Sequence, residues 1–537
     1  MIIKPKEVSG EYDFCIIGGG IAGITCSLEL EGSGSKILIL ESGLEKSTKL
    51  NQKLFEGELA NNLHPPADKY RYRQAGGSSS QWGGRCVPFD EIDFEKRDYI
   101  HKSGWPLKTV DLESFYEGAC HYLDIGKNNF EGFDDNDCSS LIEGFESSNF
   151  SDDSVERLSK PTNFWKKYKN NITKSKSIFY CLDATVVDIE RSSDLLQKVV
   201  FKNSALESFE AKAKKFIFCQ GGLETTRFFL NMVKKNSHFL AEERKILGKY
   251  YMCHLAGVAG KIYPKRNIDY GYGKDEEVYI RRRYKIIPDA QRNYKIGNFI
   301  VRIHFPDISD PEHNTGILSL LYFISSFIGY EYGNRLSKGS TKSRFISFFK
   351  HLKNLIFDIK NLSYEIFNLV FYRIFADRKK MPLMKAASKY YSFDFHSEQE
   401  PNPNSNISLS NNVDKYGLNK LKINWNYSKK DIETINIGLK LLTREILQSN
   451  LAHIEISDTE IYQESIRYGA YGGHHIGTTR SGLNCSDSVV DKNLKIHSMR
   501  NVYICSTSVF PTSSQANPTF TLVVLALRLS KYLRKSE

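Results

Sequence analysis

A strand, a glycine-rich turn and a helix near the amino-terminal end constrain the fold of this chain more than any other feature. Residues 13–43 read DFCIIGGGIAGITCSLELEGSGSKILILESG, beginning with a buried apolar strand. Gly18, Gly20 and Gly23 form G-x-G-x-x-G at the turn into the helix. The first glycine permits the tight turn, the second lets a pyrophosphate approach the backbone, and the third lets helix and strand pack closely. This arrangement predicts a dinucleotide-binding unit.

An acidic residue strengthens this prediction. Residues 37–40 form a second apolar strand, and Glu41 ends it, 18 residues after Gly23. A carboxylate in this place accepts hydrogen bonds from ribose hydroxyls. Because FAD and NAD both carry a ribose, both cofactors remain open at this point.

Further segments belong to the same unit. Residues 177–190 alternate apolar and polar side chains like strands, and residues 214–230 read as a strand, a Gly-Gly turn and a helix. Residues 76–79 form a glycine-serine loop whose amides and hydroxyls could cradle a phosphate or a ring edge. We therefore expect a cofactor domain that is interrupted by other material.

The carboxyl-terminal segment indicates the chemistry. It contains GGHHIGTTRSG from Gly472 and later Asn517-Pro518, which opens a helix. A histidine in a glycine-rich loop can act as a general base because its unperturbed pKa, about 6.5, lies near neutral pH. The segment can place this imidazole and the amide of Asn517, which has both donor and acceptor groups, over the same face of a bound cofactor.

Composition is that of a globular protein with an unevenly spread positive charge. The chain has 537 residues and ten cysteines without a CxxC pair, which favours neither a zinc site nor a disulfide framework, so we expect no metal. The formal net charge is +11. No nucleic-acid motif accompanies it. The first strand starts at about Asp13 with no signal peptide before it, so a cytoplasmic location is expected, peripheral to the inner face of the membrane if the basic region binds lipid.

That basic region is a helical insertion at 316–380. Residues 331–380 hold eleven Lys or Arg and four acids, a net charge of +7, with apolar residues at helical spacing. The apolar run at 316–330 is shorter than the roughly 20 residues that span a bilayer. Two interpretations stay open: helices that pack on their own domain, or a basic amphipathic surface that contacts anionic lipid.

Taken together, these segments resemble the glucose–methanol–choline (GMC) oxidoreductases, which are FAD-dependent alcohol dehydrogenases and oxidases. GGGIAG with Glu41, GGSSSQWGG, QGGLETTRFFL, EQEPNPNSNISLS and HHIGT with Asn517-Pro518 carry the resemblance. It covers about residues 1–110, 160–255 and 395–535, and it looks most like bacterial alcohol or sugar dehydrogenases with a pyranose-oxidase-like flavin loop. Residues 256–394 match poorly.

The resemblance implies the site. His474, and not His475, has the position of the catalytic base, and Asn517 that of its partner. Gln81 stands where some members carry a flavin-linking histidine, so we expect dissociable FAD. The residues that the resemblance implies for FAD binding are Gly18, Gly20, Ala22, Gly23, Glu41, Gly76, Gly77, Ser78, Ser79, Val186, Gly221, Ser508, Asn517 and Pro518.

The predicted fold class is α/β: a discontinuous Rossmann-like FAD-binding domain, and a second, α+β substrate-binding domain built on an antiparallel sheet with the helical insertion. The predicted ranges are 1–100, 175–255 and 465–537 for the first domain, and 101–174 and 256–464 for the second.

The predicted function is oxidation of an alcohol, in particular a sugar, polyol or glycoconjugate, to a carbonyl by hydride transfer to flavin N5. Alternatives are a dehydrogenase of a non-sugar alcohol such as choline or a lipid alcohol, and a non-catalytic flavoprotein subunit of a membrane-associated complex. A pyridine-nucleotide-dependent reductase would need a second G-x-G-x-x-G unit, and the sequence has none. The sequence leaves the electron acceptor open among oxygen, a quinone and a cytochrome.

Overall fold

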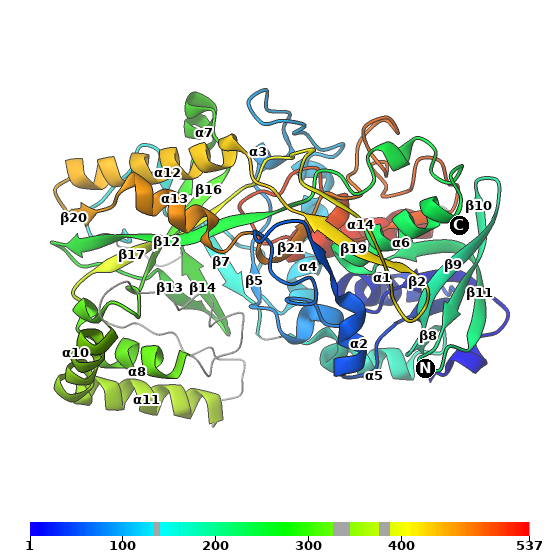
Figure 1. Ribbon diagram of the computed structural model, residues 1–537, viewed down its shortest axis with the longest axis horizontal. Helices are drawn as coiled ribbons and strands as arrows, with labels where there is room; N and C mark the ends of the chain where they lie inside the picture. Colours follow the sequence, from blue (N-terminus) through cyan, green and yellow to red (C-terminus); the bar gives the residue numbers. More distant parts are fainter. Residues whose placement is uncertain (133–139, 161, 326–343, 375–386, 536–537) are drawn as a thin grey trace.

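The computed structural model describes the whole chain except residues 133–139, 161, 326–343, 375–386 and 536–537. Two large sheets lie towards opposite ends of the long axis, and both chain termini lie at the end that carries β2 and β11 (Figure 1). Each sheet has its own hydrophobic core. The amino-terminal unit, the glycine loops and the carboxyl-terminal helix all belong to the first core.

The first sheet has eight strands and is parallel in its central part. Its order is β1-β8-β3-β2-β11-β10-β9, and β22 also pairs with β11. β10 runs antiparallel to both of its neighbours, whereas the other pairs are parallel. The strands are β1 (Ile2–Ile3), β2 (Glu11–Ile17), β3 (Ile37–Leu40), β8 (Ile178–Cys181), β9 (Thr185–Ser192), β10 (Leu195–Lys202), β11 (Ser208–Phe218) and β22 (Val502–Ile504). The strands predicted at residues 13–17, 37–40, 177–190 and 214–218 are confirmed.

Helices on this sheet bring distant segments together. α1 (Ile21–Glu31) packs against α14 (Thr519–Lys535) and α5 (Phe164–Lys174), and α14 packs against α4 (Tyr116–Leu123). α6 (Gly221–Lys235) follows β11 and confirms the helix predicted there. The packing of α14 on α1 places the carboxyl-terminal helix beside the helix that follows the glycine turn.

The second large sheet is antiparallel and has the order β20-β12-β17-β16-β15-β6, with β21 also on β12. The strands are β6 (Phe150–Ser151), β12 (Met252–Pro264), β15 (Tyr284–Ile286), β16 (Phe299–His304), β17 (Tyr391–Ser397), β20 (Ala452–Glu455) and β21 (Tyr471–Ile476). The long helix α12 (Lys429–Gln448) packs on it and begins with a capping box between Ser428 and Asp431. α13 (Asp458–Arg467) lies against β12.

Two small sheets and three short helices complete this architecture. Their elements are β5 (Arg85–Cys86), β7 (Val155–Leu158), β13 (Tyr272–Asp275) and β14 (Val278–Arg282) in one sheet, β4 (Gly57–Leu59), β18 (Asn406–Val413) and β19 (Asn419–Asn424) in the other, and the helices α2 (Lys49–Gln52), α3 (Glu91–Phe94) and α7 (Pro288–Tyr294). The sheet that contains β5 lies beside the cavity described below, since Arg85, Leu158, Tyr272 and Arg281 line it.

Packing divides the chain differently from the predicted domain ranges. α4 and α5 fall inside the range 101–174, which we assign to the second domain, yet their apolar faces lie in the first core. Conversely, β4 pairs with β19, and Ala67 lies in the second core, although both fall inside the range 1–100. The predicted ranges differ from the observed packing because the apolar face of a helix does not specify which sheet the helix will cover.

The described part of the insertion forms a small helical unit. α8 (Gly316–Ile324) packs against α10 (Arg344–Phe357) and α11 (Ile359–Ile374). Asp358 accepts a hydrogen bond from the backbone N–H of Gly316 at 2.7 Å. The helical prediction is therefore confirmed for these residues, whereas 326–343 and 375–380 lie outside the described part.

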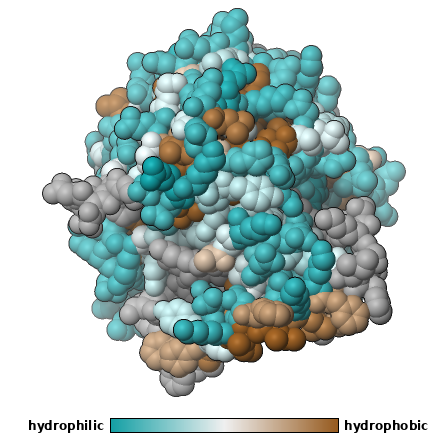
Figure 2. Space-filling model, turned by 90° about the vertical axis from the view of Figure 1, so that its left-hand side faces the viewer, coloured by the Kyte–Doolittle hydropathy of each residue, from teal (hydrophilic) through white to brown (hydrophobic). Residues whose placement is uncertain are grey.

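The outer face of this unit is apolar. Figure 2 shows apolar atoms along its lower edge, in the region of α10 and α11. Exposed members are Ile356, Phe357, Ile359, Tyr364 and Phe367, each at least 60% exposed. Within the described residues, no helix combines the length and the apolar character needed to cross a bilayer.

Candidate active site

A cavity of about 440 Å³ opens where the carboxyl ends of β2, β3, β11 and β22 meet β21. Ligands of open parallel sheets bind at this edge. Its lining joins the glycine turn after β2 to the histidines of β21 and to Asn517 before α14. The cavity thus brings together residues from both ends of the sequence.

The glycine turn is shaped to leave room over Gly20. A Cβ atom on Gly23 would lie 2.0 Å from the carbonyl oxygen of Gly18, so this glycine lets α1 pack against the turn. Gly18 has φ +107°, and a Cβ there would lie 2.6 Å from the carbonyl oxygen of Cys219. A Cβ on Gly20 would meet no atom within 4 Å. The turn therefore offers bare backbone to the cavity at Gly20.

Glu41 lies in the cavity wall next to this turn. Its carboxylate accepts hydrogen bonds from the backbone N–H of Gly19 at 2.8 Å and of Gly43 at 2.6 Å. Burial is the main influence on this carboxyl and raises its pKa. The backbone donors hold the side chain in one orientation, with a place on the cavity surface where a hydroxyl group could donate to it.

The glycine-serine loop lies over the glycine turn. The N–H of Gly76 donates to the carbonyl of Gly19 at 2.9 Å, which ties the two loops together. Gly77 and Ser78 line the cavity, whereas Ser79 is buried behind them and its hydroxyl donates to the carbonyl of Gly76 at 2.6 Å. The side chain of Gln81 also lies in the cavity wall.

His474 projects into the same cavity from β21, and its Nδ1 lies 2.7 Å from Nδ1 of His254 on β12. His254 Nε2 is 3.1 Å from the carbonyl oxygen of Ser513. Burial and the neighbouring His254 and Arg85 hold the pKa of His474 well below its usual range. A neutral imidazole, able to accept a proton, therefore faces the cavity at neutral pH.

His475 follows His474 on β21 and also lines the cavity. Its Nδ1 is 2.6 Å from the hydroxyl of Tyr251, which also lies 2.8 Å from Nε2 of His64. All three side chains are buried. Burial lowers the pKa of His475 well below the usual value and that of His64 to about 4. The Nδ1 atom of His475 is therefore engaged by the hydroxyl of Tyr251.

The remaining predicted residues fall into two groups. Ala22, Val186, Gly221 and Asn517 line the cavity. Ser508 and Pro518 are buried away from it, and the Ser508 hydroxyl bonds to those of Ser506 and Thr479.

Several polar residues of the wall are not among the predicted site residues. Ser506 and Thr507 follow β22 in the lining, and Thr507 donates to the carbonyl of His475 at 2.5 Å. Arg71 and Arg73 bind the carboxylate of Glu224 at 3.0 and 3.2 Å. The repeated basic residues of RYR were a signal for these arginines, but nothing local indicates their partner.

His254 and His396 are interpreted from the sequence as structural or surface residues, without a role in the site. They lie on β12 and β17, two neighbouring strands of the second sheet, and their ring centroids are 4.4 Å apart. With His474 they bring three imidazoles together. The Nδ1 atoms of His254 and His474 are joined by a hydrogen bond, whereas the buried Nε2 of His396 has no hydrogen-bond partner.

The parallel sheet, the bare glycine turn and the histidine lie in one cavity, as the sequence predicts for a dinucleotide-dependent oxidoreductase. Residues 401–526 match the family model described as GMC oxidoreductase. The chain is 20% identical to 6'''-hydroxyparomomycin C oxidase of Streptomyces lividus, over 98% of this chain and 92% of that protein. It is 27% identical to paromamine 6'-oxidase of Streptomyces fradiae, over 24% of this chain and 23% of that protein.

The crystal structure of pyridoxine 4-oxidase from Mesorbium loti has the same fold, with a TM-score of 0.55 at 14% identity, over 97% of this chain and 98% of that one. Residues 401–526 therefore form a GMC oxidoreductase domain, and the relatives that the chain resembles are named oxidases and dehydrogenases. The family is FAD-dependent in general.

Proposed function

We propose that this protein oxidises an alcohol to a carbonyl compound with FAD as the hydride acceptor and His474 as the base. The observation that carries the proposal is a neutral imidazole in the same cavity as the bare glycine turn. FAD, when bound, supplies the two-electron acceptor for the hydride.

The residues present fit this cofactor. Gly20 leaves the space that a pyrophosphate needs beside the amino-terminal end of α1, where the helix dipole favours a negative charge. Glu41 would accept from ribose hydroxyls, and the loop at Gly77 and Ser78 would contact the ring system. Because Gln81 has no nucleophilic ring nitrogen, FAD is expected to dissociate without breaking a covalent bond.

The protein's part in the reaction is proton transfer and positioning. His474 takes the hydroxyl proton as the C–H bond breaks, and the side-chain amide of Asn517 donates to the alcohol oxygen as it gains negative charge. The hydride leaves the carbinol carbon with its electron pair, so the products are a carbonyl compound and a protonated His474.

The cavity wall beside Tyr272 carries an excess of positive charge. Arg85 and Arg281 line the cavity beside Tyr272. Arg85 is paired with Glu156 at 3.0 Å, and the same carboxylate also binds Arg283 and Arg302. With Asp394, which pairs with Arg281 and Arg302, two carboxylates face four guanidinium groups. This excess of positive charge disfavours a small quaternary ammonium alcohol such as choline.

The class of substrate that we propose is a sugar, polyol or glycoconjugate. Two relatives are named oxidases of 6'''-hydroxyparomomycin C and of paromamine, which supports a sugar-bearing compound over a simple alcohol.

A peripheral membrane contact is a separate proposal, supported by the exposed apolar side chains of α10 and α11 and by the net charge of +7 over 331–380.

The test is anaerobic bleaching of the FAD-loaded protein by a panel of alcohols: neutral sugars, sugar phosphates, aminoglycosides, choline and long-chain alcohols. We expect sugars or sugar phosphates to reduce the flavin and choline to fail. A protein that binds FAD and is bleached by no member of the panel would instead fit the non-catalytic flavoprotein. Bleaching by choline alone would overturn the proposed substrate class.

A further inference from the structure

The hydrogen bonds around His254 determine which of its nitrogens carries the proton. Nε2 lies 3.1 Å from the carbonyl oxygen of Ser513, which can only accept, so Nε2 carries the hydrogen. His254 is fully buried, and burial lowers its pKa to about 4, so the ring is neutral near pH 7. A neutral imidazole has one N–H, and Nδ1 of His254 is therefore a bare acceptor.

The tautomer of His474 follows from this. Its Nδ1 lies 2.7 Å from the bare Nδ1 of His254, so His474 must donate the hydrogen from its own Nδ1. His474 is neutral as well, because its pKa is held well below the usual range. Its lone pair then lies on Nε2, the nitrogen that His254 does not engage.

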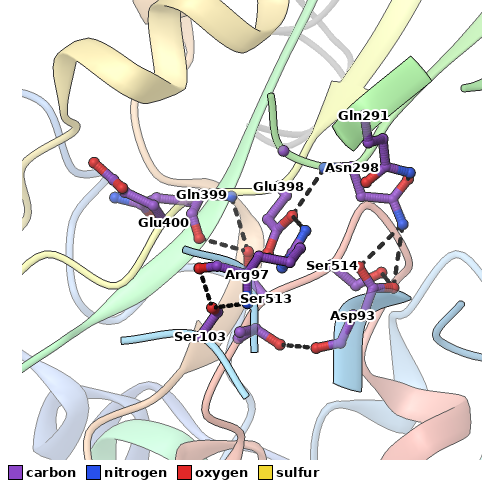
Figure 3. Close-up of polar contacts among 12 residues, drawn as sticks. Asp93, Arg97, Ser103, Gln291, Asn298, Glu398, Gln399, Glu400, Ser513 and Ser514 are labelled. Carbon is purple, nitrogen blue, oxygen red and sulfur yellow. Dashed lines mark hydrogen bonds and ion pairs between the residues drawn. The ribbon is translucent and has the colours of Figure 1, made fainter. Parts of the chain in front are cut away.

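The carbonyl group of Ser513, which accepts the hydrogen bond from His254, is held in place by buried polar groups (Figure 3). The Ser513 hydroxyl donates to the carbonyl of Gln399 at 3.0 Å and accepts from the N–H of the same residue at 2.8 Å. The Ser514 hydroxyl donates to Asp93 at 2.6 Å. Beside Gln399, Glu398 is held by two hydrogen bonds from Arg97, at 2.8 and 2.6 Å.

His396 provides an internal comparison. Its Nδ1 lies 2.5 Å from the carbonyl oxygen of Gln515, on the same loop. It is as buried as His254 and stacks close to it, with ring centroids 4.4 Å apart. No hydrogen bond joins His396 to His474 among the described residues, so it shares the packing of His254 without its contact to the base.

We propose that His254 is a positioning residue that holds His474 in the tautomer with Nε2 unprotonated and turned to the substrate. The inference rests on the proposed function, because it assigns His474 as the base. His254 does not line the cavity, so it would not touch a substrate bound there. When His474 accepts a proton on Nε2, the Nδ1–H bond to His254 becomes charge-assisted, which stabilises the protonated base.

Because the acceptor at Nδ1 of His254 is neutral, it does not raise the pKa of His474 as a negative charge would. An ionised carboxylate at this place would raise the pKa of His474 by its negative charge. An imidazole orients the ring without that charge, so the base stays unprotonated at neutral pH and still has an acceptor for its second N–H. A wrong tautomer would present an N–H to the alcohol and could not take its proton.

The test compares three variants of the FAD-loaded protein. His254→Leu removes the acceptor at similar volume. His254→Asn places an amide oxygen one bond from Cγ, where Nδ1 was, and so keeps an acceptor for His474. His396→Leu is the matched control, because it removes a buried imidazole that also bonds to a carbonyl of the loop at Ser513 to Gln515. Each is measured for FAD content, for the rate of flavin reduction by the best alcohol under anaerobic conditions, and for the apparent dissociation constant of that alcohol.

We expect His254→Leu to slow flavin reduction by about 10- to 100-fold, the effect of losing one buried hydrogen bond to a reacting group. The alcohol's dissociation constant should stay within about threefold, because no cavity wall changes. His254→Asn should recover most of the rate, and His396→Leu should keep it. Equal losses in His254→Leu and His396→Leu, or no recovery in His254→Asn, would show a packing role and overturn the proposal.

A second measurement is independent of activity. Neutron diffraction from deuterium-exchanged crystals of the wild-type protein should show deuterium on Nδ1 of His474 and on Nε2 of His254, with none on Nε2 of His474. Deuterium on Nε2 of His474 would refute the inference even if an alcohol reduced the flavin. If the map agrees and no alcohol reduces the flavin, the tautomers stand and the proposed function fails.

Discussion

Two glycines of the same turn should respond in opposite ways to the same substitution. In Gly20→Ala the new methyl group meets no protein atom within 4 Å, and Gly20 has φ −84°, which alanine adopts freely. The apoprotein should be as stable as wild type, or more stable by up to about 1 kcal/mol because the unfolded chain loses entropy. In Gly23→Ala the methyl group would lie 2.0 Å from the backbone oxygen of Gly18. Backbone must move, which should cost about 1–3 kcal/mol.

FAD binding separates the two glycines further. The methyl group of Gly20→Ala occupies the space that we assign to the pyrophosphate, so the dissociation constant of FAD should rise at least about tenfold, or 1.4 kcal/mol. The assay is titration of the apoprotein with FAD, followed by flavin fluorescence, beside a denaturant unfolding curve of each apoprotein. If Gly20→Ala binds FAD like wild type, the pyrophosphate does not lie over Gly20. If Gly23→Ala unfolds like wild type, the close packing of α1 on the turn is not a constraint.

Three further predictions concern acidity, a buried ion pair and the insertion. Because the pKa of His474 lies well below its usual value, the base stays neutral as pH falls through 6.5; kcat/KM should hold there, and a decline already centred at 6.5 or above would contradict this. Arg97→Met leaves the buried carboxylate of Glu398 unpaired and should destabilise the protein by about 3–5 kcal/mol in thermal unfolding; a loss under about 1 kcal/mol would show that the carboxylate finds another partner. Phe357→Asp should reduce co-sedimentation with anionic vesicles, whereas Leu483→Asp, at an equally exposed apolar site, should not; if neither variant nor wild type sediments, the membrane proposal fails.

The sequence was sufficient for features whose physical cause is local. The turn at Gly18 to Gly23 needs only a strand before it and a helix after it, and the structure has both at the predicted residues. Helical periodicity predicted the helices of the insertion in the same way. The role of Glu41 in cofactor binding stays a prediction, although its place in the cavity wall agrees with it.

Features that depend on the pairing of strands far apart in the chain could not be predicted from the sequence. His254 meets His474 because β12 pairs with β21, which joins residues 220 positions apart in the chain. The partner of Ser513 is set by the same sheet, since the end of β17 brings Gln399 beside the loop. No pattern of spacing or composition predicts which strands of a discontinuous sheet become neighbours, and the domain ranges differ from the observed packing for that reason.

The most direct measurement of the central claim is the rate of flavin reduction in the His474→Ala variant. Wild type and variant are loaded with FAD to the same occupancy and mixed anaerobically with the alcohol that best bleaches the wild-type protein. Loss of a general base should slow the bleaching by about 100-fold or more while the variant still binds FAD. Bleaching of the variant at the wild-type rate would show that His474 does not take the proton from the alcohol.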